Sequence, residues 1–290
     1  MNIKKIVASG LTVGLLFATQ GVDFAQAFDK TSSITVISRE EGSGTRGAFV
    51  ELFEVMGEIK GKKADLTTLD AQITNSTSVM MTTISGDEYA IGYTSLGALN
   101  DSVKAVKINN AEATVANIQS GQYPVSRPFN IATLGDVQNQ TAKDFINFIL
   151  STEGQKIVSQ AGYIPLNNTK AYQVNKVQGK AIVGGSSSVA PVMEKLAEAY
   201  KKVNPQAEIE LQVNDSTTGM MSTINKTYDI GLASRGLKEQ EIKQGLKATV
   251  IATDGIAVII NKSNPIENLT TTQVKEIYLG NTTSWDMVSK

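Results

Sequence analysis

The chain has 290 residues, and its 27 basic and 28 acidic side chains give a formal net charge of −1 at pH 7. It contains no histidine and no cysteine. Ser-His-Asp catalysis, histidine or cysteine metal ligation, disulfides and a lipid-modified cysteine are therefore excluded. The balanced, interspersed charge lacks the footprint of a nucleic-acid-binding protein. These absences favour a binding protein over an enzyme, and the length suits two domains.

The first predicted element is an export signal. Lys4 and Lys5 precede an uncharged stretch from Ile6 to Ala18, and residues 25–27 match an A-x-A cleavage site. We therefore expect residues 1–27 to be a signal peptide that is cleaved near Ala27. The mature chain is then expected in the periplasm, at the cell surface or secreted, without a lipid anchor.

A strand, a glycine-serine turn and a helix are predicted next. The β-branched run 34–37 predicts the strand, and after the turn the apolar residues fall on one helix face, namely Phe49, Leu52, Phe53 and Met56. The first amides of a helix lack partners and lie at its positive end, so this turn suits an anion. Ser43 and Thr45 add hydroxyls, and Arg39 or Arg46 adds a guanidinium. A capped helix start without a ligand is the alternative.

The remaining elements alternate between strands and helices. In the first half we expect a loop or short helix at 62–74, a helix at 76–84 with hydroxyl residues at its N-cap, strands at 90–95, near 103–108 and at 129–134, a helix at 141–160 and a connector at 167–179. In the second half we expect strands at 180–183, 208–213 and 229–234, one bent or two short strands at 250–260, and helices at 189–200, 216–224 and 270–279.

An internal repeat organises these elements. STSVMMTTISGDEYAIGYTS at 76–95 matches STTGMMSTINKTYDIGLAS at 216–234, and a strand, a Gly/Ser turn and a helix precede each copy. Alternating strands and helices predict mostly parallel sheets, with ligands at the carboxyl ends of the strands. Two facing lobes would bring several helix N-termini to one small oxyanion. A duplicated scaffold without a ligand is the alternative.

Several long motifs resemble the periplasmic phosphate-binding proteins of the phosphate-specific ABC importer. They include SREEGSGTRGAFVE, AIGYTSLGAL, YPVSRPF, GGSSSVAPVMEKLAEAYKKVNP and DIGLASRGLKEQE. The resemblance covers nearly all of residues 33–290 and implies an α/β, two-lobe periplasmic-binding-protein (type II) fold, each lobe a mostly parallel sheet flanked by helices.

The order of the motifs departs from the family, because SREEGSGTR precedes GGSSSVAP in this chain. We therefore expect a circular permutation, with the old termini joined through 167–179. The resemblance then implies a contiguous lobe 1 at 120–253 and a discontinuous lobe 2 made of 33–119 plus 254–290, with a hinge formed by the segments near 252–261 and 107–129.

The resemblance also assigns binding residues. It implies phosphate ligands at Arg39, Ser43, Gly44, Thr45, Ser187, Ser188, Ser216 and Ser234. Glu41 matches the acidic residue that pairs with the arginine, and the repeat places Ser76 and Thr77 as supporting residues. Arg235 stands where some members carry an aspartate, so we expect Asp254, or failing that Glu41, to accept the proton of phosphate.

The implied function is capture of inorganic phosphate between the lobes and its delivery to the membrane permease of an ABC importer, by a monomer without catalysis, cofactor or metal. Three other functions stay open. They are binding of sulfate, molybdate or another oxyanion, a serine hydrolase with a Ser-Lys pair, and a surface phosphate sensor or adhesin.

Overall fold

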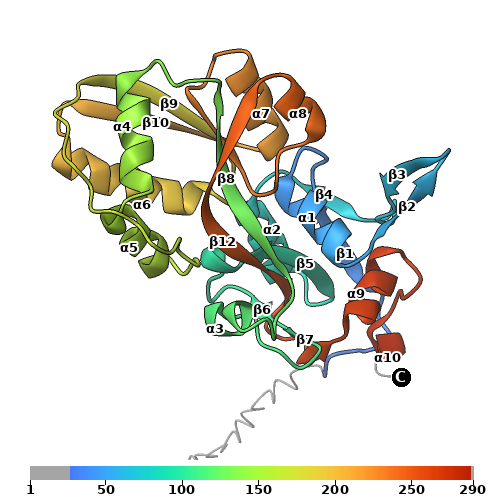
Figure 1. Ribbon diagram of the computed structural model, residues 1–290. Helices are drawn as coiled ribbons and strands as arrows, with labels where there is room; N and C mark the ends of the chain where they lie inside the picture. Colours follow the sequence, from blue (N-terminus) through green and yellow to red (C-terminus); the bar gives the residue numbers. More distant parts are fainter. Residues whose placement is uncertain (1–26, 289–290) are drawn as a thin grey trace, which may run out of the picture.

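The structure is a computed structural model that describes residues 27–288, and two lobes joined by long strands are visible in it (Figure 1). The predicted signal peptide lies outside the described residues except for Ala27. Within the described part of the chain, none of the helices combines the length and the apolar character that a membrane crossing requires.

The middle of the chain forms one lobe, which we call lobe 1. Its elements are β8 (Ser126–Leu134), α4 (Gln140–Ile149), α5 (Thr152–Gln160), β9 (Gly179–Ser186), α6 (Ala190–Val203), β10 (Ala207–Asn214), α7 (Ser216–Ile224), β11 (Ile230–Ala233), α8 (Glu239–Lys243) and the first part of β12 (Leu246–Ile260). The strand order is β10-β9-β11-β8-β12. The strands β10, β9 and β11 are parallel, whereas β8 is antiparallel to both of its neighbours.

The two ends of the described chain form the other lobe, lobe 2. Its elements are β1 (Thr35–Arg39), α1 (Gly44–Leu52), β2 (Met56–Ile59), β3 (Lys62–Asp65), β4 (Gln72–Thr74), α2 (Thr77–Gly86), β5 (Ala90–Ser95), the 3-10 helix η1 (Leu96–Ala98), β6 (Lys104–Ala105), β7 (Lys107–Ile108), α3 (Val115–Gln119), the second part of β12, β13 (Asn268–Leu269), α9 (Thr271–Tyr278) and α10 (Trp285–Val288). The strand order is β4-β1-β5-β12-β6, with β4, β1 and β5 parallel and β12 antiparallel. The same pattern in both lobes confirms the predicted repeat.

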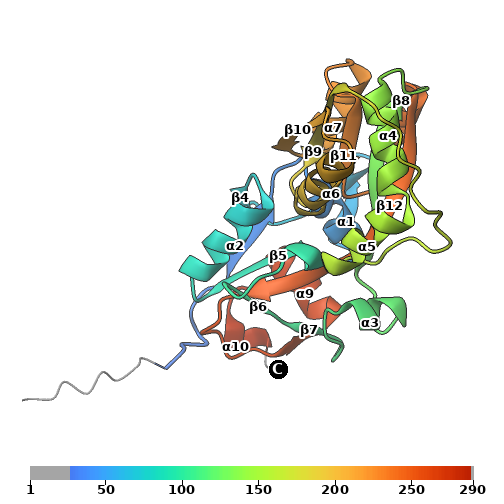
Figure 2. The ribbon, with the colours of Figure 1, turned by 90° about the vertical axis from the view of Figure 1, so that its left-hand side faces the viewer.

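The sheets are mixed because β8 and β12 run antiparallel to the outer strands and to each other. Both strands pass through the centre of the molecule, from the upper lobe to the lower one (Figure 1 and Figure 2). The segment predicted as one bent or two short strands is the single strand β12, whose pairing with β8 shifts between Val250 and Ala252. Together, β8 and β12 form the connection between the lobes.

Each lobe has its own hydrophobic core. In lobe 2 the ring of Phe49 stacks on that of Tyr93, with centroids 4.0 Å apart, which ties α1 to β5. In lobe 1 the rings of Phe145 and Tyr200 pack α4 against α6. Val125 belongs to the core of lobe 2, whereas the core of lobe 1 begins at Phe129. The chain therefore crosses between the cores over a few residues.

Two predicted elements near the first helix are wrong. The helix ends at Leu52, because the backbone turns through Glu54 at φ 54° and Met56 already belongs to β2. The segment 62–74, predicted as a loop or short helix, contains β3 and β4 instead. Pairing with β2 and β1 supplies the hydrogen bonds of these strands, and the polar sequence of the segment did not reveal those partners.

Two other predicted elements are each divided. The helix expected over 141–160 is α4 followed by α5, since Ser151 caps α5 by accepting from the amide of Gly154 at 3.1 Å. A Cβ at Gly154 would overlap the carbonyl of Phe148, so glycine allows α5 to begin against the end of α4. The strand expected near 103–108 is β6 and β7, which belong to different sheets.

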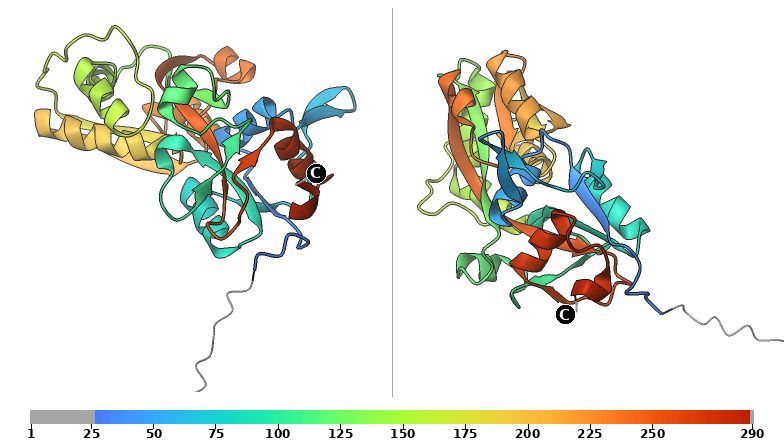
Figure 3. Two further views of the ribbon diagram at one scale, coloured as in Figure 1. Left: turned by 90° about the horizontal axis from the view of Figure 1, so that it is seen from below. Right: turned by 90° about the vertical axis from the view of Figure 1, so that its right-hand side faces the viewer.

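The two ends of the described chain lie side by side in lobe 2 (Figure 3). The amide of Ile34 donates to the carbonyl of Thr283 at 2.8 Å, and the amide of Asp286 donates to Lys30 at 2.7 Å. In lobe 1 the connector 167–179 is held by the buried carboxylate of Asp144, which accepts from Tyr172 at 2.5 Å. The connector is therefore fixed to lobe 1 by this side-chain contact. It contains no helix or strand from 167 to 178.

Candidate functional site

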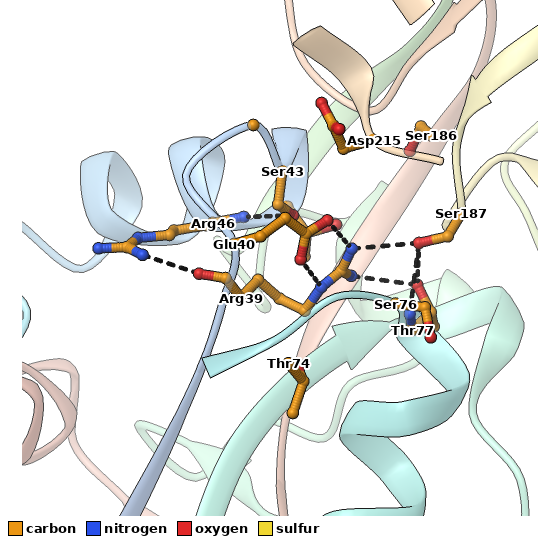
Figure 4. Close-up of polar contacts among 12 residues, drawn as sticks. Arg39, Glu40, Ser43, Arg46, Thr74, Ser76, Thr77, Ser186, Ser187 and Asp215 are labelled. Atoms are coloured by element: carbon orange, nitrogen blue, oxygen red, sulfur yellow. Dashed lines mark hydrogen bonds and ion pairs between the residues drawn. The ribbon is translucent and has the colours of Figure 1, made fainter. Parts of the chain in front are cut away.

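Arg39 is the centre of the candidate site (Figure 4). It ends β1 and is 3% exposed. Its Nε and Nη2 donate to the two carboxylate oxygens of Glu40 at 2.7 and 2.6 Å. The predicted pairing with Glu41 is therefore wrong. The amide of Glu40 still bonds to Thr74 of β4, which holds Glu40 beside the guanidinium, whereas the side chain of Glu41 is exposed.

Hydroxyl groups from both lobes meet at Arg39. The Oγ of Ser187, from lobe 1, accepts from Arg39 Nη2 at 3.1 Å and lies 3.2 Å from the Oγ1 of Thr77, from lobe 2. Ser188 Oγ lies 3.0 Å from Thr77 Oγ1 and 2.8 Å from Thr45 Oγ1. The structure thus brings these predicted residues together across the cleft, and the lobes contact each other directly.

A second group of hydroxyls adjoins the first. Ser186 Oγ donates to Ser234 Oγ at 3.0 Å, and the amide of Ser234 donates to Ser216 Oγ at 3.1 Å. Gly44 of lobe 2 lies against this group, because a Cβ there would overlap Ser216 Oγ and would lie 2.8 Å from Ser234 Oγ. Ser186, Ser216 and Ser234 are at most 3% exposed. The buried serines of lobe 1 therefore face the N-terminus of α1.

Helix N-termini supply the electrostatics of the site. Ser43 caps α1 by accepting from the amide of Arg46 at 3.3 Å, and Ser76 caps α2 by accepting from Val79 at 3.2 Å. The positive ends of α1, α2 and α7 and the turn before α6 all carry site hydroxyls. Aligned backbone dipoles and unpaired amides favour an anion at such ends.

The caps explain why Thr77, predicted only as a supporting residue, is central. Asp215 caps α7 and Ser76 caps α2, so the next residue of each helix, Ser216 or Thr77, is the buried one. The sequence match aligns Ser76 with Ser216, which is one residue out of step with these caps. The half-buried Ser76 is therefore a helix cap, and Thr77 takes the position that Ser216 has in lobe 1.

Arg46, the alternative guanidinium, forms its hydrogen bonds outside the group of site hydroxyls. Its Nε donates to Asp65 Oδ2 of β3 at 2.6 Å, and its Nη1 donates to the carbonyl of Arg39 at 2.8 Å. In Figure 4 its side chain extends away from Ser187 and Thr77. Arg46 therefore braces the end of β1, and Arg39 is the guanidinium that points at the hydroxyls.

Asp254 lies between the lobes on β12, in a buried ion pair. Its Oδ2 accepts from Arg127 Nη2 at 3.1 Å, and its Oδ1 accepts from Ser95 Oγ at 2.9 Å. Burial raises the pKa of Asp254 to about 6, although Arg127 and Ser95 act to lower it. Burial likewise lowers the pKa of Arg127. Both oxygens of Asp254 are thus engaged by groups of the lobe connection, so its predicted role as proton acceptor stays a prediction.

The arrangement is suited to holding a small oxyanion. A buried guanidinium and converging hydroxyl donors can replace the hydration shell of a tetrahedral anion. Within residues 27–288, no cluster of three or more acidic side chains is placed to hold a metal ion. Glu40, Ser186 and Arg127 were missed, although the YPVSRPF and GGSSSVAP motifs contain two of them. Glu40 stands in the SREEGSGTRGAFVE motif directly after Arg39, but the resemblance assigned the pairing to its neighbour Glu41.

Comparisons with known proteins show the family of the chain. A family model described as a PBP superfamily domain matches residues 20–153 and 170–289. The phosphate-binding protein PstS 2 of Streptococcus agalactiae serotype V is 52% identical over 290 residues, which cover 99% of this chain and 98% of that protein. The phosphate-binding protein PstS of Borreliella burgdorferi is 32% identical over 106 residues, or 37% of this chain and 38% of that protein.

Among solved structures, one of a phosphate-binding protein of a phosphate ABC transporter from Streptococcus pneumoniae TIGR4 is similar. It has a TM-score of 0.70 and 41% sequence identity, and the match covers 89% of this chain and all of that one. The fold, the site and the relatives lead to one conclusion. This chain belongs to the PBP superfamily and, within it, to the family of PstS-type phosphate-binding proteins of phosphate ABC transporters.

Proposed function

We propose that this protein captures inorganic phosphate between its lobes and delivers it to the permease of an ABC importer. The observation that carries the proposal is the buried Arg39 facing hydroxyls of both lobes, with Ser187 Oγ 3.1 Å from Nη2. Charge-assisted hydrogen bonds of about 1.5 to 3 kcal/mol each can together reach the roughly 8 kcal/mol of a micromolar site, after desolvation is subtracted. The function of its relatives supports the same ligand.

The mechanism requires binding and closure but no reaction. Residues of both lobes contact a ligand held at Arg39, so the ligand stabilises the closed arrangement that a permease would recognise. The relatives are binding proteins rather than enzymes. We further propose that the protein acts as a monomer, outside the cytoplasm, after cleavage near Ala27.

Calorimetric titration of the mature chain, residues 28–290, tests the proposal. Phosphate-stripped protein is expected to bind phosphate with a Kd of about 1 μM or tighter at neutral pH, and equimolar sulfate is expected not to displace it. Stronger binding of sulfate or molybdate than of phosphate would mean that the ligand is that other oxyanion. A folded protein that binds none of these anions would refute the proposal.

A separate variant tests which side chain accepts the proton of phosphate. Sulfate carries no proton at neutral pH, whereas phosphate keeps one and needs an acceptor, which we propose to be Asp254. Asp254→Asn is then expected to lose the preference for phosphate over sulfate in competition titrations. Unchanged selectivity in a folded Asp254→Asn protein would remove Asp254 from this role, and Glu41, the second choice, would be the next carboxylate to test.

Gly44→Ala is predicted to prevent closure at the site. The added Cβ would overlap Ser216 Oγ, so the lobes would have to separate, and we expect phosphate affinity to fall by about tenfold or more. Gly47→Ala is the matched control in the same helix, because its Cβ would meet Arg235 Cδ at 4.0 Å, an ordinary contact. Equal affinities of the two variants would contradict the close approach of Gly44 to lobe 1.

We also propose that the chain is a circular permutant whose lobes, 120–253 and 33–119 plus 254–290, move about the β8–β12 connection. The adjacent chain ends and the docked connector make such an order physically feasible. The Borreliella burgdorferi protein aligns over only 37% of this chain, which a permuted order would produce because a collinear alignment can follow one exchanged segment at a time. The Streptococcus agalactiae protein aligns over 99% and would share this order.

A further inference from the structure

A contact between the lobes lies beside the candidate site but uses none of its predicted ligands. The carbonyl of Gly42, in the loop before α1, accepts from both the amide and the Oγ1 of Thr217 in α7, each at 3.1 Å. A Cβ at Gly42 would overlap the carboxylate of Asp215, so a larger residue would have to displace the side chain that caps α7. This contact joins lobe 2 to lobe 1 independently of Arg39.

Arg235 orients the hydroxyl of Thr217. Its Nη2 donates to Thr217 Oγ1 at 3.3 Å, which leaves the hydroxyl proton free to donate to Gly42. The carboxylate of Glu241 fixes the guanidinium, accepting from Nη2 at 2.7 Å and from Nη1 at 2.9 Å. Burial would raise the pKa of Glu241, but hydrogen bonds from Arg235 and the amide of Lys238 lower it, so the carboxylate stays ionised at neutral pH.

The contact lies at the rim of the cleft. Arg235, Thr217 and Gly42 all line a cavity of about 430 Å³ between α1 and lobe 1. In Figure 1, α1 of lobe 2 lies below the helices α7 and α8 of lobe 1. The side chains of Arg235 and Glu241 are 11% and 7% exposed, so solvent screens their interaction weakly. A polar chain of fixed geometry therefore runs from Glu241 through Arg235 and Thr217 to the carbonyl of Gly42.

We propose that the two hydrogen bonds from Thr217 to the carbonyl of Gly42 form a latch that holds the lobes together. Arg235 is the positioning residue that orients the hydroxyl of Thr217 for this contact. The proposal rests on the proposed function, since phosphate is bound by the closed protein. The latch raises the population of the closed form, and the apparent Kd equals the intrinsic Kd divided by that population. Loss of the latch therefore weakens phosphate binding and speeds phosphate release without removing a ligand.

Thr217→Val and Arg235→Gln test the latch in the mature chain. Valine keeps the shape and the amide of Thr217 but lacks the hydroxyl, so we expect the Kd for phosphate to rise about three- to tenfold, with most of the change in the dissociation rate. Thr217→Ser is expected to bind within about twofold of the wild type. Because both residues act through one contact, the double variant is expected to bind phosphate no more weakly than the weaker-binding of the two single variants.

Thr218→Val is the control, because the Thr218 hydroxyl bonds to Asp215 within lobe 1. Wild-type affinity of Thr217→Val, or additive losses in the double variant, would overturn the latch. Small-angle scattering of the phosphate-free proteins separates this result from a failure of the proposed function. The latch predicts a larger radius of gyration for Thr217→Val than for the wild type even if neither binds phosphate, and equal radii would also overturn it.

Discussion

Arg39→Ala is expected to cause the largest loss of phosphate affinity of any single substitution in this chain. Arg39 is the buried guanidinium of the site, and truncating one partner of a buried, hydrogen-bonded charge pair costs about 2 to 5 kcal/mol. We therefore expect the Kd for phosphate to rise by about 30-fold to several thousandfold, since each 1.4 kcal/mol is tenfold. Calorimetric titration measures the change, and thermal melting confirms that the variant is folded.

Arg39→Lys separates charge from geometry. Lysine keeps the positive charge but cannot donate from two nitrogens to Glu40 in the planar arrangement of Nε and Nη2. We expect its affinity to lie between those of the wild type and Arg39→Ala. Lys275→Ala is the control for net charge, because Lys275 pairs with Glu54 at the surface of lobe 2. If the Kd of Arg39→Ala for phosphate lay within threefold of that of Lys275→Ala, Arg39 would not be the guanidinium that binds the anion.

The second large effect is expected at the ion pair between the lobes, as a pH-dependent loss of stability in Arg127→Met. Ionised Asp254 is disfavoured by burial, so its pKa is about 6 in the folded protein, compared with about 3.9 in an unfolded chain. Its contribution to stability is therefore complete below about pH 4 and is lost as the pH rises through 6. Removing Arg127 takes away the cation that lowers this pKa, so the pKa rises further.

The difference between the two proteins must then grow above pH 6. In the wild type, Asp254 is ionised in both the folded and the unfolded protein above its folded-state pKa, so it costs no further stability as the pH rises. In Arg127→Met the carboxyl stays protonated in the folded protein, so stability continues to fall by about 1.4 kcal/mol for each pH unit. Between pH 6 and pH 8 we expect the free energy of unfolding of the variant to fall by about 3 kcal/mol relative to the wild type. Urea unfolding at pH 5 to 8 measures the difference, and other carboxylates cancel because both proteins contain them.

The double variant Arg127→Met/Asp254→Asn is the matched control. It lacks the titrating carboxyl, so its stability relative to the wild type is not expected to fall further above pH 6. A destabilisation of Arg127→Met that stays constant from pH 5 to pH 8 would contradict the coupling of the two side chains. The hydrogen bonds from Nε and Nη2 of Arg127 to Asp254 Oδ2 are the physical basis of this coupling.

Local patterns predicted most elements because their determinants lie close together in the chain. Ser76 caps α2, and the apolar spacing of α6 and α9 places their inward faces. Predictions failed where distant partners decide the structure. The polar strand β4 is one example, because it depends on its pairing with β1. The β2–β3 hairpin and the turn at Glu54 are local features, and the apolar periodicity did not reveal them.

The candidate site divides in the same way. The sequence by itself determined that hydroxyl-bearing turns precede helices in two matching units, and that Arg39 ends a strand beside one of them. Only the tertiary structure decided that Glu40 rather than Glu41 holds Arg39, that Thr77 rather than Ser76 joins Ser187, and that Asp254 pairs with Arg127. The reason is physical. Capping and periodicity act over a few residues, whereas these pairings depend on how the lobes pack together and on which charges that packing buries.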